Sequence, residues 1–191
     1  MAVAPAHSTA AGAGRGVAYL DATVSGSSSQ LREGSALLMV GGEQAAFTEA
    51  REILGALAPE VFHCGRAGAG ARMKLVTNLV LGLNRAALAE GLCFAEALGF
   101  TRGAALEVLL ASKAYSAIMD TKGEKMVKED FTPQARLSQH LKDVRLMLRA
   151  AAAQRFRLPL TVAHRKLLEA AEAAGLGAFD NSAVIKVLAS R

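Results

Sequence analysis

Hydrophobic and polar positions divide the chain into an α/β part and a helical part. Three short apolar runs, bounded by glycine or polar residues, predict strands at residues 16–24, 35–40 and 61–64. Between the last two runs, residues 43–57 carry apolar side chains at helical spacing, which predicts an amphipathic helix. Its expected buried face consists of Ala46, Phe47, Ala50, Ile53, Leu54 and Leu57. Strand, strand, helix, strand is the order in which an α/β unit begins.

The pattern after Gly70 is helical throughout. The expected helices lie at residues 71–98, 101–112, from Thr132-Pro133 onward, from Pro159 to before Gly175, and at residues 183–188. Leu137, Leu141, Val144 and Leu148 form an apolar stripe on the third of these. The predicted fold is therefore α+β and mostly α. Its expected parts are a loose segment over residues 1–16, an α/β part over residues 17–67 and an all-helical part over residues 68–191.

Composition narrows the possible function classes. The chain has 191 residues, of which 52% are hydrophobic and 20% charged, with a net charge of +5. Basic residues are denser over residues 136–166, but they accompany no nucleic-acid-binding motif or aromatic stacking platform, so we expect solvated helix faces there. The most apolar region, residues 75–100, is interrupted by charged and amide side chains, so no membrane span is predicted.

The spacing of the cysteine and histidine residues indicates neither a C-x-x-C motif nor a metal site. Cys64 and Cys93 form no C-x-x-C pair, which favours reduced thiols in a cytoplasmic protein. The first 16 residues have no apolar centre of the kind found in a signal peptide. His63, His140 and His164 lack metal-ligand spacing, so we expect no metal site.

The stretch HCGRAGAGARMKLVTN, residues 63–78, contains a glycine run that could hold a phosphate. A P-loop fails because Ala71 and Arg72 stand where lysine and a hydroxyl residue are required. A dinucleotide fingerprint fails because Met73 occupies the position of its third glycine. What remains is a flexible turn that opens a helix, with Lys74 and Asn78 four residues apart on one face.

Each candidate site residue has two interpretations. A lysine in the first turn of a helix meets the positive end of the helix dipole, which lowers the pKa of its ammonium and suits proton transfer. On spacing alone, the favoured interpretation of Lys74 is a solvated surface lysine. The turn at Ser25-Gly26, in DATVSG, could hold a carboxylate or be an ordinary turn. Lys142-Asp143 could point into a cleft or lie on a solvated helix face.

Four blocks together resemble the β-hydroxyacid dehydrogenase family, close to its 3-hydroxyisobutyrate dehydrogenases. They are DATVSG, EGSALLMVGG, the glycine-to-lysine block of residues 65–78 and FTPQARLSQHLKD, in the order and spacing of that family. The resemblance covers residues 17–191 and includes a last helix, DNSAVIKVL. It implies a remnant of a Rossmann-type sheet followed by a helical domain like the C-terminal domain of 6-phosphogluconate dehydrogenase.

The resemblance also implies roles for the candidate residues. Lys74 would be the catalytic residue, exchanging a proton with the substrate oxygen. Ser25 and Gly26 would bind the substrate carboxylate, and Asn78 would help to hold the substrate. Lys142 would lie near an NAD or NADP cofactor, with Asp143 orienting it. The implied substrate is a small hydroxy acid or its semialdehyde, and the implied assembly is a homodimer formed through the helical domain.

The sequence departs from the family pattern in three ways, one of which is Thr77, where many members have a second asparagine. The family's turn usually reads D-A-P-V-S-G-G, whereas Thr23 replaces the proline and Ser27 the second glycine. No G-x-G-x-x-G turn opens the chain, so we expect a truncated dehydrogenase that binds cofactor poorly and is weak or inactive alone. The alternative is a non-catalytic helical dimerisation or ligand-binding module derived from the same family.

Overall fold

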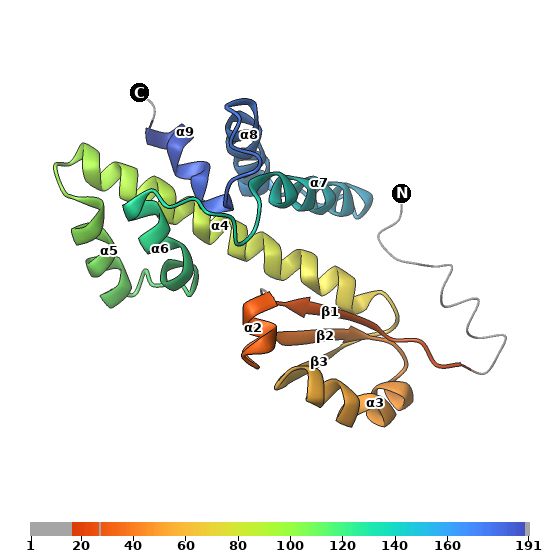
Figure 1. The fold of residues 1–191 in the computed structure, drawn as a ribbon. Coiled ribbons are helices and arrows are strands. Elements are labelled where there is room, and N and C mark those ends of the chain that lie inside the picture. Colours follow the sequence, from red (N-terminus) through yellow and green to blue (C-terminus); the bar gives the residue numbers. More distant parts are fainter. Residues whose placement is uncertain (1–16, 27, 190–191) are drawn as a thin grey trace. The chain divides into compact units, whose positions relative to one another are not determined.

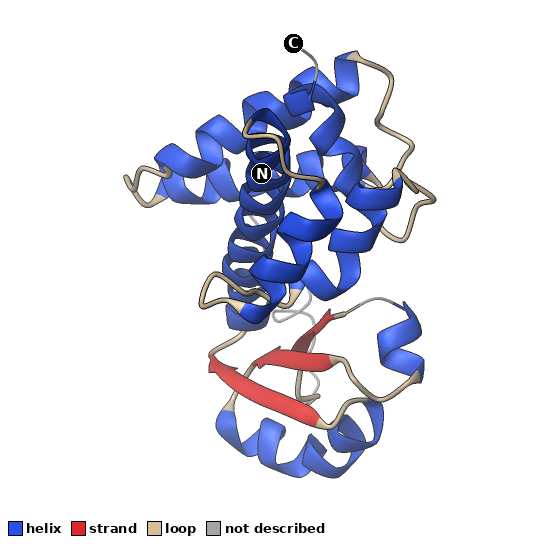
Figure 2. Ribbon diagram, turned by 90° about the vertical axis from the view of Figure 1, so that its left-hand side faces the viewer, coloured by secondary structure: helices blue, strands red, loops and turns tan. Residues whose placement is uncertain are grey.

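The computed structural model describes residues 17–26 and 28–189 of the chain. The chain divides into two compact units, residues 1–77 and 78–191. The described residues contain one sheet of three strands, and helices form most of the remaining structure. Strands and helices are distinguished by colour in Figure 2. The predicted α+β, mostly helical fold is thus confirmed.

The first unit is built on a mixed sheet of three strands, β1 (Asp21–Ser25), β2 (Leu37–Gly41) and β3 (Glu60–Gly65), in the order β1-β2-β3. β1 runs antiparallel to β2 after a short helix, α2 (Ser28–Arg32). β3 runs parallel to β2, and the crossover between them contains α3 (Gln44–Leu57). A parallel pair needs such a crossover, and this explains why strand, helix and strand follow one another here.

The three strands and the helix α3 predicted for this unit are present in the structure. The start of the first strand and the buried face of α3 differ from the prediction. The first strand was predicted too early, because residues 17–20 belong to no element, and α2 was not predicted. The core contains Leu38, Val40, Phe47, Leu54 and Ala58. Ile53 and Leu57 are 69% and 57% exposed, so the predicted apolar face of α3 was too wide.

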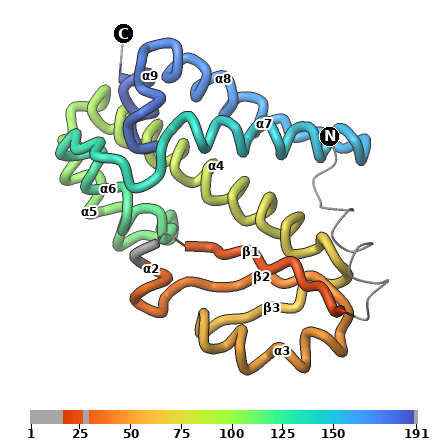
Figure 3. Tube along the Cα trace, turned by 45° about the vertical axis from the view of Figure 1, so that its right-hand side comes forward, coloured from red at the N-terminus to blue at the C-terminus, as the bar shows by residue number. Residues whose placement is uncertain are grey.

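The helix α4 (Ala69–Ala97) continues from the first unit into the second. The second unit also contains α5 (Arg102–Ala111), α6 (Ile118–Lys128), α7 (Leu137–Ala153), α8 (Pro159–Ala173), the 3₁₀ turn η1 (Asn181–Val184) and α9 (Ile185–Ala189) (Figure 1). α7 and α8 lie side by side as a helical hairpin (Figure 3). None of the helices in the described residues is long and apolar enough to cross a membrane.

Local signals explain most of these helix ends. Gly99 ends α4 with a φ of 90°, and Thr101 begins α5 by accepting a hydrogen bond from the N–H of Ala104 at 3.2 Å. Pro159 is the first residue of α8, and Gly175 follows that helix with a φ of 79°. All four signals were recognised in the sequence, and the structure confirms them.

Two helices of the second unit, α6 and α7, differ from the prediction. α6 was not predicted. α7 begins at Leu137 rather than at Thr132-Pro133, since Arg136 forms a β-bridge with Asp180 and the N–H of Leu137 donates to the carbonyl of Phe179 at 2.9 Å. These pairings hold Arg136 in an extended conformation. They join segments more than 40 positions apart, which helical periodicity does not report.

Candidate functional site

The glycine turn before α4 is bound by a side chain of β1. The buried carboxylate of Asp21 accepts hydrogen bonds from the N–H groups of Gly68 at 2.6 Å and Ala71 at 2.9 Å. These N–H groups at the start of α4 have no partner within the helix itself. Asp21 therefore caps α4 with a negative charge, where the helix dipole favours one.

The glycines of this turn allow α4 to approach the sheet closely. A Cβ added to Gly70 would collide with the carbonyl oxygen of Met39 and lie 2.8 Å from that of Asp21. Gly68 has a φ of 84°, in the region that favours glycine. The run thus serves tight packing and a turn, as expected once the phosphate motifs had failed.

Lys74 lies farther from the helix start than the sequence suggested. It follows Ala69, the first residue of α4, by five positions and therefore stands in the second turn, where its side chain is half-buried. The dipole acts within the first turn, and the Asp21 carboxylate already opposes it there. Lys74 therefore lies one turn beyond the position that the sequence pattern had indicated.

Ser25 and Gly26 form the end of β1 and the turn after it. Ser25 is the last residue of the strand and pairs with Leu37 of β2. Gly26 has a φ of 142°, and a Cβ added to it would lie 3.0 Å from the Cβ of Ala36. The turn therefore requires glycine for both backbone conformation and space.

The remaining candidates lie in the second unit, on α4 and α7. The Asn78 amide donates a hydrogen bond to the Asp143 carboxylate at 3.5 Å. Asp143 is half-buried, whereas the neighbouring Lys142 is exposed. The structure thus brings Asn78 and Asp143 together, a contact that the sequence did not predict.

The start of α4 does not fit a cofactor phosphate. A pyrophosphate at a helix N-terminus is held by free backbone N–H groups, and those of Gly68 and Ala71 already bind the Asp21 carboxylate. A phosphate would have to displace a buried negative charge. Lys142 and Asp143 remain the candidate cofactor contacts. Among the described residues, no three or more histidine, cysteine or acidic side chains gather so that they could hold a metal ion.

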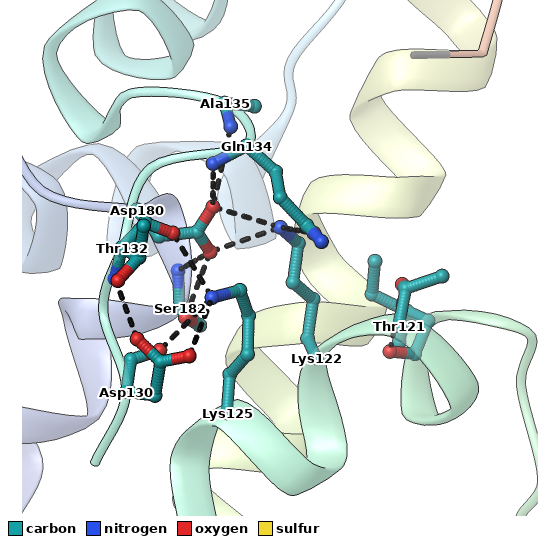
Figure 4. Close-up of polar contacts among 10 residues, drawn as sticks. Thr121, Lys122, Lys125, Asp130, Thr132, Gln134, Ala135, Asp180 and Ser182 are labelled. Atoms are coloured by element: carbon teal, nitrogen blue, oxygen red, sulfur yellow. Dashed lines mark hydrogen bonds and ion pairs between the residues drawn. The ribbon is translucent and has the colours of Figure 1, made fainter. Parts of the chain in front are cut away.

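A buried ion pair forms the centre of a second polar cluster, in the helical unit (Figure 4). Lys122 of α6 contacts both carboxylate oxygens of Asp180 at 2.9 Å. The same carboxylate accepts hydrogen bonds from the N–H groups of Gln134, Ala135 and Ser182. Burial raises the pKa of Asp180, but the Lys122 ammonium and these donors outweigh that effect and bring its pKa to about 2. The Asp180 carboxylate is therefore ionised at neutral pH.

Two histidines and an arginine are buried where α4, α7 and α8 meet. The rings of His140 and His164 lie 5.1 Å apart, and a Cβ on Gly82 would lie 2.5 Å from the Nε2 of His140. Burial and the nearby Arg85 charge lower the pKa of His140 to about 2 and that of His164 to about 4. Burial also lowers the pKa of Arg85 to about 10. Both histidines are therefore neutral in the folded chain at pH 7, which agrees with a structural role.

Comparison with known proteins identifies the family. Residues 68–188 match the family model described as NAD-binding of NADP-dependent 3-hydroxyisobutyrate dehydrogenase, and residues 5–65 match that of the NAD binding domain of 6-phosphogluconate dehydrogenase. The chain belongs to the β-hydroxyacid dehydrogenase family. This family acts on small hydroxy acids and uses NAD or NADP.

Named relatives of this β-hydroxyacid dehydrogenase chain are longer than it is. The 2-(hydroxymethyl)glutarate dehydrogenase of Eubacterium barkeri is 35% identical over 91% of the chain and 58% of its own length. The crystal structure of 3-hydroxyisobutyrate dehydrogenase from Salmonella typhimurium is similar with a TM-score of 0.87 and 31% identity, over 95% of this chain and 64% of that one. The Mycobacterium tuberculosis 3-hydroxyisobutyrate dehydrogenase with L-serine gives a TM-score of 0.84 and 30% identity, over 95% and 65%. The chain thus spans about three fifths of the length of these relatives.

Proposed function

We propose that this chain supplies the substrate-binding and proton-transfer part of an NAD(P)-dependent 3-hydroxyacid dehydrogenase. Its substrate is a short 3-hydroxy acid or the matching semialdehyde. Lys74 exchanges a proton with the substrate oxygen, and Asn78 hydrogen-bonds the same molecule. Ser25 and the main chain of Gly26 receive the substrate carboxylate.

One observation carries this proposal: Lys74 and Asn78 follow each other by one turn on a helix whose start is anchored by Asp21. The anchoring hydrogen bonds are 2.6 and 2.9 Å long, and the Asn78 amide contacts Asp143. A fixed helix holds the backbone of Lys74 in one place, and proton transfer requires such positioning. An exposed lysine on a loop would lack this support.

Acid–base roles follow from the substrate chemistry. Oxidation of a hydroxyl removes its proton, so Lys74 accepts that proton as a neutral amine, and in the reverse direction its ammonium donates one. A bound nicotinamide supplies the hydride chemistry. The Ser25 hydroxyl and nearby N–H groups favour a carboxylate over an uncharged group, and this restricts the substrates to acids.

We infer that these 191 residues alone bind nicotinamide cofactors weakly and turn over slowly or not at all. They contain no G-x-G-x-x-G turn, and Asp21 occupies the helix-start donors that could have replaced one. Substrate binding rests on other residues, so it can be tested separately from cofactor binding.

The test of the proposed function is a titration of the chain with 3-hydroxyisobutyrate and, separately, with L-serine. Amide NMR signals of Ser25, Gly26 and Asn78 report where each acid binds. We expect their shifts to saturate, and Lys74→Ala to weaken binding by about ten- to a hundredfold through loss of a charged hydrogen-bond donor. Calorimetry with NAD⁺ and NADP⁺ measures cofactor affinity on the same samples.

Lys166→Ala is the matched control, because Lys166 is an exposed lysine of α8 that the proposal does not use. It should leave acid binding unchanged. Equal affinities of the wild-type chain and the Lys74→Ala variant would contradict the proposed role of Lys74. Tight cofactor binding by the unmodified chain would contradict the proposed weakness of the chain alone.

A specific surface of the second unit favours the alternative, a helical dimerisation module. Phe94, Leu98 and Phe100, at the end of α4, are 62%, 59% and 61% exposed. Such neighbouring large apolar side chains are typical of interaction surfaces. Light scattering should then give a dimer mass that Phe94→Glu and Leu98→Glu reduce to a monomer. A monomeric wild-type chain would contradict both this alternative and the homodimer that the family resemblance implies.

A further inference from the structure

β1 and the start of α4 are joined by more than the Asp21 cap. The hydroxyl of Thr23 lies 3.0 Å from the carbonyl oxygen of Gly70 and 3.3 Å from that of Met39, and it donates a hydrogen bond toward them. Asp21 binds the N–H groups on either side of Gly70, at Gly68 and Ala71. Two side chains of β1 therefore bind the start of α4. Asp21 accepts hydrogen bonds from two of its N–H groups, and Thr23 donates one to the carbonyl of Gly70.

Thr23 departs from the family's usual turn pattern. In the family's turn pattern this position is usually proline, which has no hydroxyl. Thr23 pairs with Met39 in the sheet, and the Thr77 hydroxyl of α4 lies 4.0 Å from the Met39 sulfur. α4 thus follows the sheet from Gly70 to Thr77, and Lys74 lies within that segment.

β1 links these anchoring residues to the proposed carboxylate site. Side chains two positions apart in a strand point to the same face, so Asp21, Thr23 and Ser25 share one side of β1. Asp21 and Thr23 place the start of α4 on that side. Lys74 follows Ala71 by three residues, which is less than one helical turn.

We propose that Asp21 and Thr23 are positioning residues that fix Lys74 relative to Ser25. This inference rests on the proposed function, in which Lys74 and Ser25 bind the same hydroxy acid. The two residues act through the backbone of α4 and do not contact the substrate. Their hydrogen bonds hold the helix start in one place, because a shift of about 1 Å between reacting groups lowers rates by about a hundredfold.

The test compares Thr23→Val, which keeps the shape but removes the hydroxyl, with Thr23→Ser, which keeps the hydroxyl. Thr48→Val is the matched control, since the Thr48 hydroxyl donates to the Gln44 carbonyl of its own helix at 2.9 Å. Asp21→Asn removes the charge of the cap. Circular dichroism establishes that each variant is folded, and if Asp21→Asn does not fold, the Thr23 variants carry the test.

Two measurements separate positioning from general stability. Amide hydrogen exchange over residues 68–74 should accelerate about tenfold or more in Thr23→Val, whereas exchange in α3 should stay unchanged. The acetylation rate of Lys74 is measured against pH by mass spectrometry, with Lys166 as the internal reference. The pH profile of this rate in Thr23→Val should differ from that in the wild-type chain. Thr23→Ser should restore both, and Thr48→Val should alter neither.

Unchanged exchange over residues 68–74 or an unchanged Lys74 profile in Thr23→Val would overturn the inference, as would failure of Thr23→Ser to restore them. These outcomes are distinct from failure of the proposed function, which Lys74→Ala reveals by leaving acid binding intact. If acid binding depends on Lys74, Thr23→Val should weaken it about threefold or more, and Thr23→Ser should not.

Discussion

Lys122 and Asp180 form a buried ion pair, with the ammonium 2.9 Å from each carboxylate oxygen. Lys122 lies on α6, whereas Asp180 begins η1 near the end of the chain. The N–H groups of the α6–α7 connection bind the same carboxylate. This one acidic group therefore holds three segments of the helical unit together.

Replacing Lys122 by methionine should lower the free energy of unfolding by about 3 kcal/mol, because the buried Asp180 charge loses its partner. Urea denaturation followed by circular dichroism measures this change. Lys128→Met is the control, since Lys128 pairs with Glu124 at 2.8 Å on the surface, with both side chains mostly exposed. It should leave the unfolding midpoint unchanged. A similar loss in both variants would show that burial of the pair is not what matters.

Two glycines of α4 should respond oppositely to alanine. At Gly82 a Cβ would lie 2.5 Å from His140 Nε2 and 2.9 Å from His164 Cε1, so Gly82→Ala should destabilise the chain by about 1–3 kcal/mol. At Gly91 no heavy atom lies within 4 Å of the added Cβ, so Gly91→Ala should stabilise the helix by about 0.5–1 kcal/mol. Thermal unfolding of the two variants distinguishes these signs. Stabilisation by both substitutions would mean that the histidines move aside freely.

The free energy of unfolding should decrease as the pH falls below the pKa of histidine in the unfolded chain. The folded pKa values of His140 and His164, about 2 and about 4, lie below the ordinary 6.5. The unfolded state therefore takes up protons first as the pH falls, and between pH 7 and pH 5 each histidine removes about 2 kcal/mol of stability. Below pH 4, protonation of Asp180 decreases the free energy of unfolding further.

Urea unfolding at pH 7, 6 and 5 measures this dependence. In His164→Leu the slope between pH 7 and pH 5 should be about half that of the wild-type chain, because one of the two buried histidines is gone. An unchanged slope in His164→Leu would contradict the assignment.

Arg155 adopts a backbone conformation that suits glycine. Its φ is 55°, in the connection between α7 and α8. Arg155→Gly should raise the free energy of unfolding by about 0.5–1 kcal/mol, since only the arginine has a Cβ that opposes this conformation. Glu129, with a φ of 53°, is the comparison, because its carboxylate also binds Arg102 at 3.0 Å. Glu129→Gly should therefore gain less stability than Arg155→Gly, and the reverse order would count against this explanation.

Local sequence rules predicted elements whose causes are local. Apolar periodicity and the signals at Gly99, Thr101 and Pro159 located α4, α5 and α8 closely. The same rules missed α6, whose buried side includes a lysine that periodicity counts as polar. Lys122 is compatible with burial only because Asp180, 58 positions later, accepts its hydrogen bonds.

The candidate site shows the same limit. The failed phosphate motifs correctly left the glycine run as a turn that opens a helix, but Asp21 was seen only as part of DATVSG. Its role as a cap depends on a contact with Gly68, 47 positions away. The Asn78–Asp143 contact likewise spans 65 positions. Capping by a residue next to the helix is visible in a sequence, whereas capping across a sheet is not.

The length of chain between β1 and α4 sets when the Asp21 cap can form. Its hydrogen bonds close loops of 47 and 50 positions, whereas β2, α3 and β3 lie next to one another along the chain. Closing the longer loop costs more chain entropy, so the parallel pair and its crossover should assemble before the cap. Loss of the Asp21 carboxylate should then accelerate unfolding and leave the refolding rate almost unchanged. The cap would then form late in folding and determine the unfolding rate, and so the lifetime, of the folded first unit.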